Sequence, residues 1–169
     1  MANWCRGILK IRGTRENIIK FLTEEVVCFR MEKQNDGKYK NIAIPLLSVN
    51  TEYEDGFEFE ECSRDLKLNI KCFKRCLGGT INCLLSEETY ERQDATYVVA
   101  FDFETKWEII PDEFVELSKT CGVDIRGKFY ECGMGFTQEI EVIGGELTLW
   151  KELNYKDYEW ECENPYWGG

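Results

Sequence analysis

The chain has 169 residues, 43% of them hydrophobic and 14% aromatic, and its formal net charge is −11. This composition is typical of one globular domain and excludes a disordered chain, and apolar stretches such as residues 97–101 are far shorter than the roughly twenty residues of a membrane-spanning helix. The excess of acids over bases argues against direct nucleic-acid binding, because phosphate contacts need clustered Lys and Arg.

The composition also includes nine cysteines and no histidine. Without histidine the chain lacks the commonest general base, the usual partner of Ser or Cys nucleophiles, and every Cys/His metal motif. The number of cysteines is odd and the N-terminus shows no signal peptide. We therefore expect reduced thiols that are mostly buried as small hydrophobic side chains.

The densest group of thiols is Cys72, Cys76 and Cys83, and its spacing fits neither a zinc ribbon nor an iron–sulfur loop. We therefore expect no metal and no cofactor. Basic residues flank the first two thiols and would lower the thiol pKa in an exposed setting. A reactive thiol is thus the alternative to a half-buried structural cysteine.

In chain order, the first predicted elements are a strand over residues 7–12 and a helix over residues 15–26. Gly13 makes the turn between them, and Thr14 is the N-cap because its side chain can accept a hydrogen bond from the first turn. Apolar side chains recur on one face of this helix at a helical period: Ile18, Ile19, Leu22 and Val26.

A hairpin and an ambiguous segment follow. Strands at residues 28–32 and 39–44 flank the sequence Asn-Asp-Gly at residues 35–37, in which Asp-Gly is a strong hairpin signal. Residues 66–77 fit both a strand and a helix, and we favour a strand that turns into a short helical segment. Another strand is expected at residues 80–85.

The second half of the chain has clearer signals. Residues 96–103 are β-rich and apolar enough for a central strand. A helix begins with Pro111 in its first turn and ends at Gly122, and Trp107 is expected in the core against this helix because the strand must turn just before it. Three further strands are expected at residues 124–132, 136–143 and 146–150, joined by turns in which glycines take positive φ.

The order strand–helix–strand thus occurs twice, with added hairpins. It predicts an α+β fold of the ferredoxin-like sandwich type, in which a mainly antiparallel sheet carries two helices on one face. No repeat, proline-rich linker or low-complexity tract divides the sequence, so residues 1–169 are expected to form a single domain.

Several segments resemble a known family. The first block is the opening Met-Ala-Asn-Trp-Cys, then Leu-Lys-Ile-Arg-Gly and the helix that follows. The second block is Phe-Asp-Phe-Glu-Thr-Lys-Trp, the helix from Pro111, Tyr-Glu-Cys-Gly-Met-Gly-Phe and the closing Asp-Tyr-Glu-Trp-Glu-Cys. Over residues 1–25 and 96–165 the chain resembles the YubB-type ferredoxin-like proteins of phages and plasmids.

This resemblance implies a ferredoxin-like chain path, which needs no iron–sulfur cluster, and an accessory protein of a phage or plasmid in the host cytoplasm. Residues 45–95 match the family poorly and are expected to be an insertion, and residues 151–169 form an aromatic and acidic C-terminal tail. The family offers no established catalytic residues to carry over.

Two acidic stretches are candidate partner-binding surfaces. Residues 51–61 hold six acids and no base, and residues 139–169 hold eight acids and two bases among several aromatic residues. Aromatic side chains would anchor a basic partner, and carboxylates would steer it or mimic nucleic-acid phosphates. The alternative is a solvated sheet face with a packed C-terminal segment. The candidate residues are Glu52, Glu54, Asp55, Glu58, Glu60, Glu61, Tyr158, Trp160 and Trp167.

The opposite charge is concentrated in residues 63–86, which hold five bases and one acid. This segment could contact an anion or RNA, or it could complement the acidic stretch just before it in a pair of strands.

We therefore predict a phage or mobile-element accessory protein that is not an enzyme and acts by binding a host macromolecule. The predicted partner is a host protein with a basic surface, such as a nucleic-acid-handling enzyme of a CRISPR or other defence system, which the protein would inhibit. The alternative is a nucleic-acid- or nucleotide-binding accessory protein that uses residues 63–86. A third hypothesis is a nucleotide-acting enzyme with an unrecognised acidic site.

Overall fold

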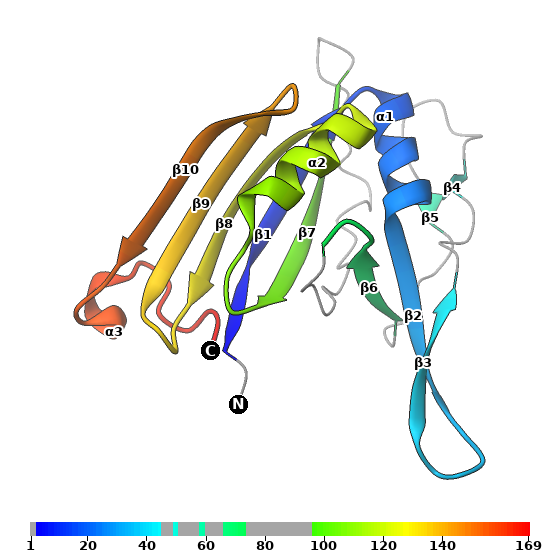
Figure 1. The fold of residues 1–169 in the computed structure, drawn as a ribbon, viewed down its shortest axis with the longest axis horizontal. Helices are drawn as coiled ribbons and strands as arrows, with labels where there is room; N and C mark the ends of the chain where they lie inside the picture. The colour runs from blue at the N-terminus through cyan, green and yellow to red at the C-terminus, as the bar shows by residue number, and fades with distance from the viewer. Residues whose placement is uncertain (1–2, 45–48, 51–57, 60–65, 74–95) are drawn as a thin grey trace.

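The computed structural model describes residues 3–44, 49–50, 58–59, 66–73 and 96–169 (Figure 1). In chain order the elements are β1 (Trp4–Gly13), α1 (Arg15–Lys20), the π-helical turn η1 (Phe21–Glu25), β2 (Val26–Lys33), β3 (Tyr39–Ile44), β4 (Val49–Asn50), β5 (Glu58–Phe59), β6 (Leu66–Ile70), β7 (Tyr97–Lys106), α2 (Pro111–Cys121), β8 (Asp124–Glu131), β9 (Phe136–Ile143), β10 (Glu146–Asn154) and α3 (Tyr158–Glu161).

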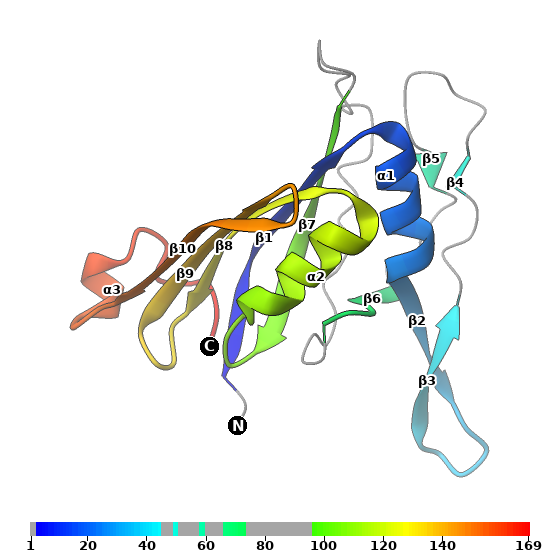
Figure 2. The same cartoon turned by 45° about the horizontal axis from the view of Figure 1, so that its top comes forward.

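The main sheet has five strands in the order β10-β9-β8-β1-β7, and every pair of neighbours is antiparallel. A second sheet has the order β3-β2-β6, and β4 pairs with β5. On the main sheet, α2 contacts β8, β9 and β10, while α1 contacts β1, β7 and α2 (Figure 2). The predicted α+β class with a mainly antiparallel sheet is confirmed.

The expected central position of residues 96–103 is wrong. In the described sheet β7 is an edge strand, paired with β1 from Gly13↔Tyr97 to Trp4↔Lys106. Its apolar character has a different cause, because Val99 and Phe103 alternate onto the buried face. β1 takes the interior position between β7 and β8.

The first helix begins as predicted. The Thr14 hydroxyl accepts a hydrogen bond from the Asn17 amide at 3.3 Å, which satisfies one free donor of the first turn. The helix ends one residue earlier than expected, because its last turn is π-helical and Val26 already starts β2. Val26 is still buried, since the strand continues into the core.

The second helix and the hairpins also follow their signals. Pro111 stands in the first turn of α2, and Gly122 ends it with a φ of 68°, which glycine adopts without strain. The Asp-Gly turn joins β2 to β3. Within residues 66–77 the strand reading is confirmed as β6, whereas residues 74–77 and the strand expected at 80–85 lie outside the described residues.

The core lies between the main sheet and the helices. Aromatic rings form its centre. The ring centroid of Phe103 lies 5.4 Å from that of Phe129 and 5.3 Å from that of Phe73, and the centroid of Phe114 in α2 lies 4.7 Å from that of Phe73. Gly7 of β1 lies beside Phe129, and a Cβ there would stand 2.0 Å from the Lys128 carbonyl oxygen. Only glycine therefore fits this position.

Trp107 is not in the core. Its side chain is 50% exposed, and its φ is 72°, in the left-handed region. The expected packing against α2 is wrong because the chain leaves β7 through a tight turn at Trp107, which directs the ring outward. Ile109, two residues later, is buried in its place.

The C-terminal segment folds back onto the start of the chain, so both termini lie at the same end of β1 (Figure 1). The Gly169 amide donates to the Trp4 carbonyl at 2.9 Å, and the Cys132 thiol contacts the Gly168 carbonyl at 3.1 Å. Tyr130, Tyr158 and Cys162 form a small second core beneath this segment. In the part of the chain that the structure describes, no helix is long and apolar enough to cross a membrane.

Candidate functional site

The face of the main sheet that points away from the helices carries two adjoining grooves. Side chains alternate along β1, so Ile8 and Lys10 are exposed while Leu9 and Ile11 are buried. The larger groove has a volume of about 420 Å³ and the smaller one about 260 Å³, and Lys10 and Arg126 line both. Ile8, Gly127, Lys128, Tyr130, Glu139, Asn164 and Trp167 complete the lining of the larger groove.

Strand register concentrates positive charge in these grooves. Lys10 of β1 stands directly opposite Arg126 of β8, and Ile8 stands opposite Lys128. The basic lining residues are Lys10, Arg12, Arg126 and Lys128, and the carboxylates are Asp124, Glu139 and Glu141. The lining bases outnumber the lining carboxylates by one, and Glu163, which is not part of the lining, balances this excess by its ion pair with Lys128. The grooves are thus close to neutral in a chain whose net charge is −11.

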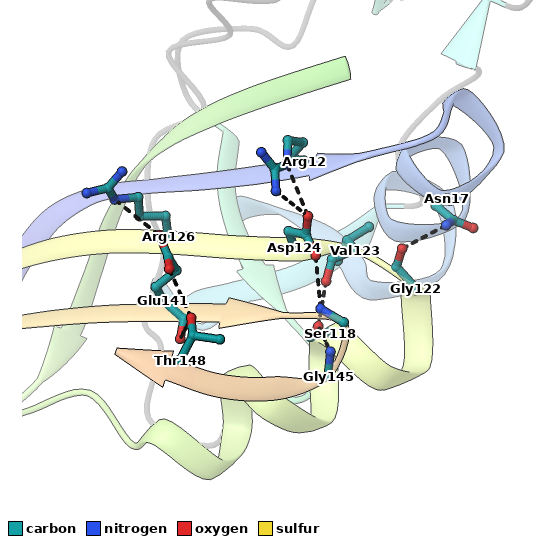
Figure 3. A network of polar contacts seen from close by, with 11 residues as sticks. Arg12, Asn17, Ser118, Gly122, Val123, Asp124, Arg126, Glu141, Gly145 and Thr148 are labelled. Carbon is teal, nitrogen blue, oxygen red and sulfur yellow. Dashed lines mark hydrogen bonds and ion pairs between the residues drawn. The ribbon is translucent and has the colours of Figure 1, made fainter. Parts of the chain in front are cut away.

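Arg12 is held in one orientation. Its Nε and Nη2 atoms donate to Oδ2 of Asp124 at 3.0 and 2.6 Å, and Oδ1 of Asp124 accepts from the Gly144 amide at 3.0 Å (Figure 3). The pair is partly exposed, so it contributes little to stability, but it fixes the guanidinium at the edge of the smaller groove.

Arg126 is less tightly held. Its Nη2 atom lies 3.9 Å from Glu139 and its Nε atom 3.8 Å from Glu141, distances at which charges attract without a hydrogen bond. Glu141 instead accepts a hydrogen bond from the Thr148 hydroxyl at 2.9 Å (Figure 3). The donors of Arg126 therefore remain available in the groove.

The C-terminal segment forms one wall of the larger groove. Trp167 lies edge-to-face on Tyr130 with ring centroids 5.6 Å apart, and the Lys128 ammonium lies 5.7 Å from the Tyr130 ring. Glu163 forms an ion pair with Lys128. Tyr130 and Trp167 therefore form an aromatic end of the groove, next to the bases of β1 and β8.

The same segment presents two aromatic side chains to solvent, Trp160 at 86% and Tyr166 at 92% exposure, which we call the aromatic rim. Trp160 belongs to α3, where its amide donates to the Asp157 carbonyl at 3.2 Å. The exposed carboxylates Glu159, Glu161 and Glu163 lie next to the rim in sequence.

Comparison of the chain with protein-family models, with curated proteins and with solved structures finds no match.

The residues predicted to bind a partner differ in their burial and in whether the structure describes them. Glu58 lies in β5, and Glu52, Glu54, Asp55, Glu60 and Glu61 lie outside the described residues. Trp160 is exposed as expected, and Trp167 is partly buried against Tyr130. Tyr158 requires a correction: it is 7% exposed and packs on Tyr155 at 5.5 Å, because the short helix α3 turns it inward. Its ring offers no anchor to a partner.

Three of the thiols in the described residues are poorly suited to nucleophilic chemistry. Burial raises the pKa of Cys5 and of Cys72 to about 12 and that of Cys121 to about 11, with nearby carboxylates adding to the effect. For Cys72 this corrects the alternative of a reactive thiol, since its environment disfavours the thiolate. Cys76 and Cys83 lie outside the described residues.

Sequence reasoning missed the groove because it looked for bases in one continuous segment. In that segment, the Lys71 ammonium donates to the Glu24 carbonyl, and Arg64, Lys74 and Arg75 lie outside the described residues. The signal that could have identified the groove was the alternation of bases in two predicted strands, Lys10 with Arg12 and Arg126 with Lys128.

Proposed function

We propose that the protein is a non-enzymatic accessory protein of a phage or other mobile element that binds a host protein with a basic surface in the host cytoplasm. The favoured partner is a nucleic-acid-handling enzyme of a CRISPR or other defence system, which the protein inhibits. The observation that carries this proposal is the aromatic rim, in which Trp160 and Tyr166 stand exposed beside carboxylates on a fastened segment.

An exposed tryptophan on an ordered backbone is suited to binding. Trp160 loses little conformational entropy on contact, because α3 and the packing of Tyr158 already order its backbone. Tryptophan and tyrosine supply most of the energy in many interfaces when they enter a pocket on the partner. The neighbouring carboxylates would steer a basic surface toward the rim.

We further propose the ferredoxin-like chain path of the YubB-type proteins. The arrangement β8-β1-β7 supports it: β1 lies between two antiparallel strands, α1 follows β1, and α2 connects β7 to β8. β9 and β10 extend the sheet beyond β8. A phage or plasmid origin rests on the same resemblance.

The proposal is tested by affinity capture from a lysate of the native host, followed by binding measurements with the captured protein. We expect Trp160→Ala to weaken binding by about tenfold or more, the effect of removing a hot-spot aromatic. Tyr39→Ala is the matched control, because Tyr39 is also an exposed aromatic residue but lies in the β2–β3 hairpin. Equal binding by the wild type and both variants would contradict the proposed contact.

A further inference from the structure

The two grooves meet at a pair of cations, Lys10 and Arg126, that line both of them. Lys10 and Arg126 are direct partners on neighbouring strands, and like charges in such positions destabilise a sheet. Among the described residues, none forms an ion pair or a hydrogen bond with the Lys10 ammonium. Arg126 forms ion pairs with Glu141 and Glu139 at 3.8 and 3.9 Å, which are too long for hydrogen bonds.

The surroundings of this pair are ordered. On one side Arg12 is fixed by Asp124, which in turn holds the turn after β9 (Figure 3). On the other side Trp167 packs against Tyr130, and the last residue of the chain is hydrogen-bonded to Trp4. The Lys10 ammonium, which has no ion-pair partner among the described residues, therefore stands between the Arg12–Asp124 pair and the Trp167–Tyr130 contact. A charge without a partner in ordered surroundings is a feature that a binding site has and a purely structural surface lacks.

We propose that the larger groove binds a mononucleotide, with its phosphate on Lys10 and Arg126 and its base against Trp167 and Ile8. A phosphate satisfies both cations at once, and arginine presents two donors to it. Ile8 is 39% exposed and supplies an apolar floor between the cations and the aromatic wall. The volume of about 420 Å³ is that of a small-molecule site of about 300–1,000 Å³.

Charge favours a single nucleotide over a nucleic-acid strand. A strand extends beyond the groove and meets the field of a chain with net charge −11. A mononucleotide meets mainly the local groups of the groove, where Arg12, Arg126 and Lys128 each face a carboxylate and Lys10 has no ion-pair partner among the described residues. This site shares the C-terminal segment with the aromatic rim but uses Trp167 in place of Trp160 and Tyr166, and it does not depend on the proposed macromolecular partner.

The test is calorimetric titration of the full chain at low salt with adenosine 5′-monophosphate, ribose 5-phosphate and single-stranded oligothymidylate. We expect saturable binding of the mononucleotide with a Kd below about 1 mM. Ribose 5-phosphate should bind at least about fivefold more weakly, because it lacks the base that stacks on Trp167. Equal binding of the two would overturn the assignment of a nucleotide.

The protein variants are Lys10→Gln and Arg126→Gln, with Lys40→Gln as the control. Lys40 is exposed on β3 in the second sheet, so its replacement makes the same change in net charge away from the groove. The two groove variants should weaken mononucleotide binding by about tenfold without lowering the melting temperature, because each removes a like-charge repulsion, whereas the control should bind normally. The proposal is overturned if the wild type does not bind, if all three variants bind alike, or if only the oligonucleotide binds.

Discussion

At the scale of single residues, Trp107 holds the most unusual backbone conformation. In the described part of the chain it is the residue other than glycine with a positive φ, 72°. Across it the Glu108 amide donates to the Lys106 carbonyl at 3.0 Å, which makes a strained three-residue turn. The Trp107 amide donates to the Asn3 carbonyl at 3.0 Å, so the turn is tied to the start of β1.

Two substitutions at Trp107 distinguish the contribution of its ring to stability from the cost of its backbone conformation. We expect Trp107→Ala to lower the free energy of unfolding by about 1 kcal/mol, well below the roughly 3–5 kcal/mol of a buried aromatic residue. Trp107→Gly should be more stable than Trp107→Ala by about 1 kcal/mol, because glycine adopts positive φ without strain. Urea unfolding measures both. A loss above about 3 kcal/mol for alanine, or a glycine variant less stable than the alanine variant, would contradict this account.

The buried thiol of Cys5 gives a pH dependence. Burial, with Glu131 and other carboxylates nearby, raises its pKa from 9.0 to about 12. Because the pKa is raised in the folded state, the contribution of this thiol to stability is fully present below pH 9. It is lost as the pH rises from there toward the pKa of the folded state. We expect the wild type to lose about 1 kcal/mol more than Cys5→Ala between pH 7.5 and pH 10, measured by urea unfolding under reducing conditions. An equal loss in both proteins would show that the thiol ionises freely.

At the scale of elements, Ser118 joins α2 to the β9–β10 hairpin. Its hydroxyl donates to the Val123 carbonyl at 2.5 Å and accepts from the Gly145 amide at 3.0 Å, and the residue is buried (Figure 3). Asn17 adds a link from α1, because its side-chain amide donates to the Gly122 carbonyl at 2.7 Å. The C-terminal end of α2 is thus fastened to two other elements.

Ser118→Ala should destabilise the protein by about 1–3 kcal/mol, because two buried backbone groups lose their hydrogen-bond partner. The matched control is Thr120→Ala, an exposed position in the same helix, which should change stability by less than about 0.5 kcal/mol. Thermal and urea unfolding would measure both variants. Equal effects would mean that water replaces the hydroxyl and that the hairpin is held by packing alone.

The elements that were predicted correctly are determined by residues within or next to them in the sequence. Pro111 and Gly122 mark the ends of α2 through their own backbone preferences, and Asp-Gly marks the hairpin at residues 35–37. The edge position of β7 and the pairing of Lys10 with Arg126 depend on strand register between distant parts of the chain. A single sequence shows no local sign of such register. The outward turn at Trp107 is likewise set by its hydrogen bond to Asn3.

At the scale of the whole molecule, charge and architecture divide the surface into unlike regions. One face of the main sheet carries the two grooves, which concentrate most of their bases on β1 and β8, while the C-terminal segment carries the aromatic rim and exposed carboxylates. The last residue of this segment is held by the hydrogen bond from the Gly169 amide to the Trp4 carbonyl. Truncation from Tyr158 would uncover the buried Tyr130 and remove the groove wall, so point variants are the sounder test of the rim.

The central claim is that the aromatic rim binds a basic partner, and the salt dependence of binding kinetics tests it most directly. With the partner captured from the host, association should slow as salt rises, because screening shortens the reach of the carboxylates. Trp160→Ala should instead speed dissociation by about tenfold or more at every salt concentration, while Tyr39→Ala should match the wild type. Association that is independent of salt, together with unchanged dissociation of the Trp160 variant, would contradict the claim.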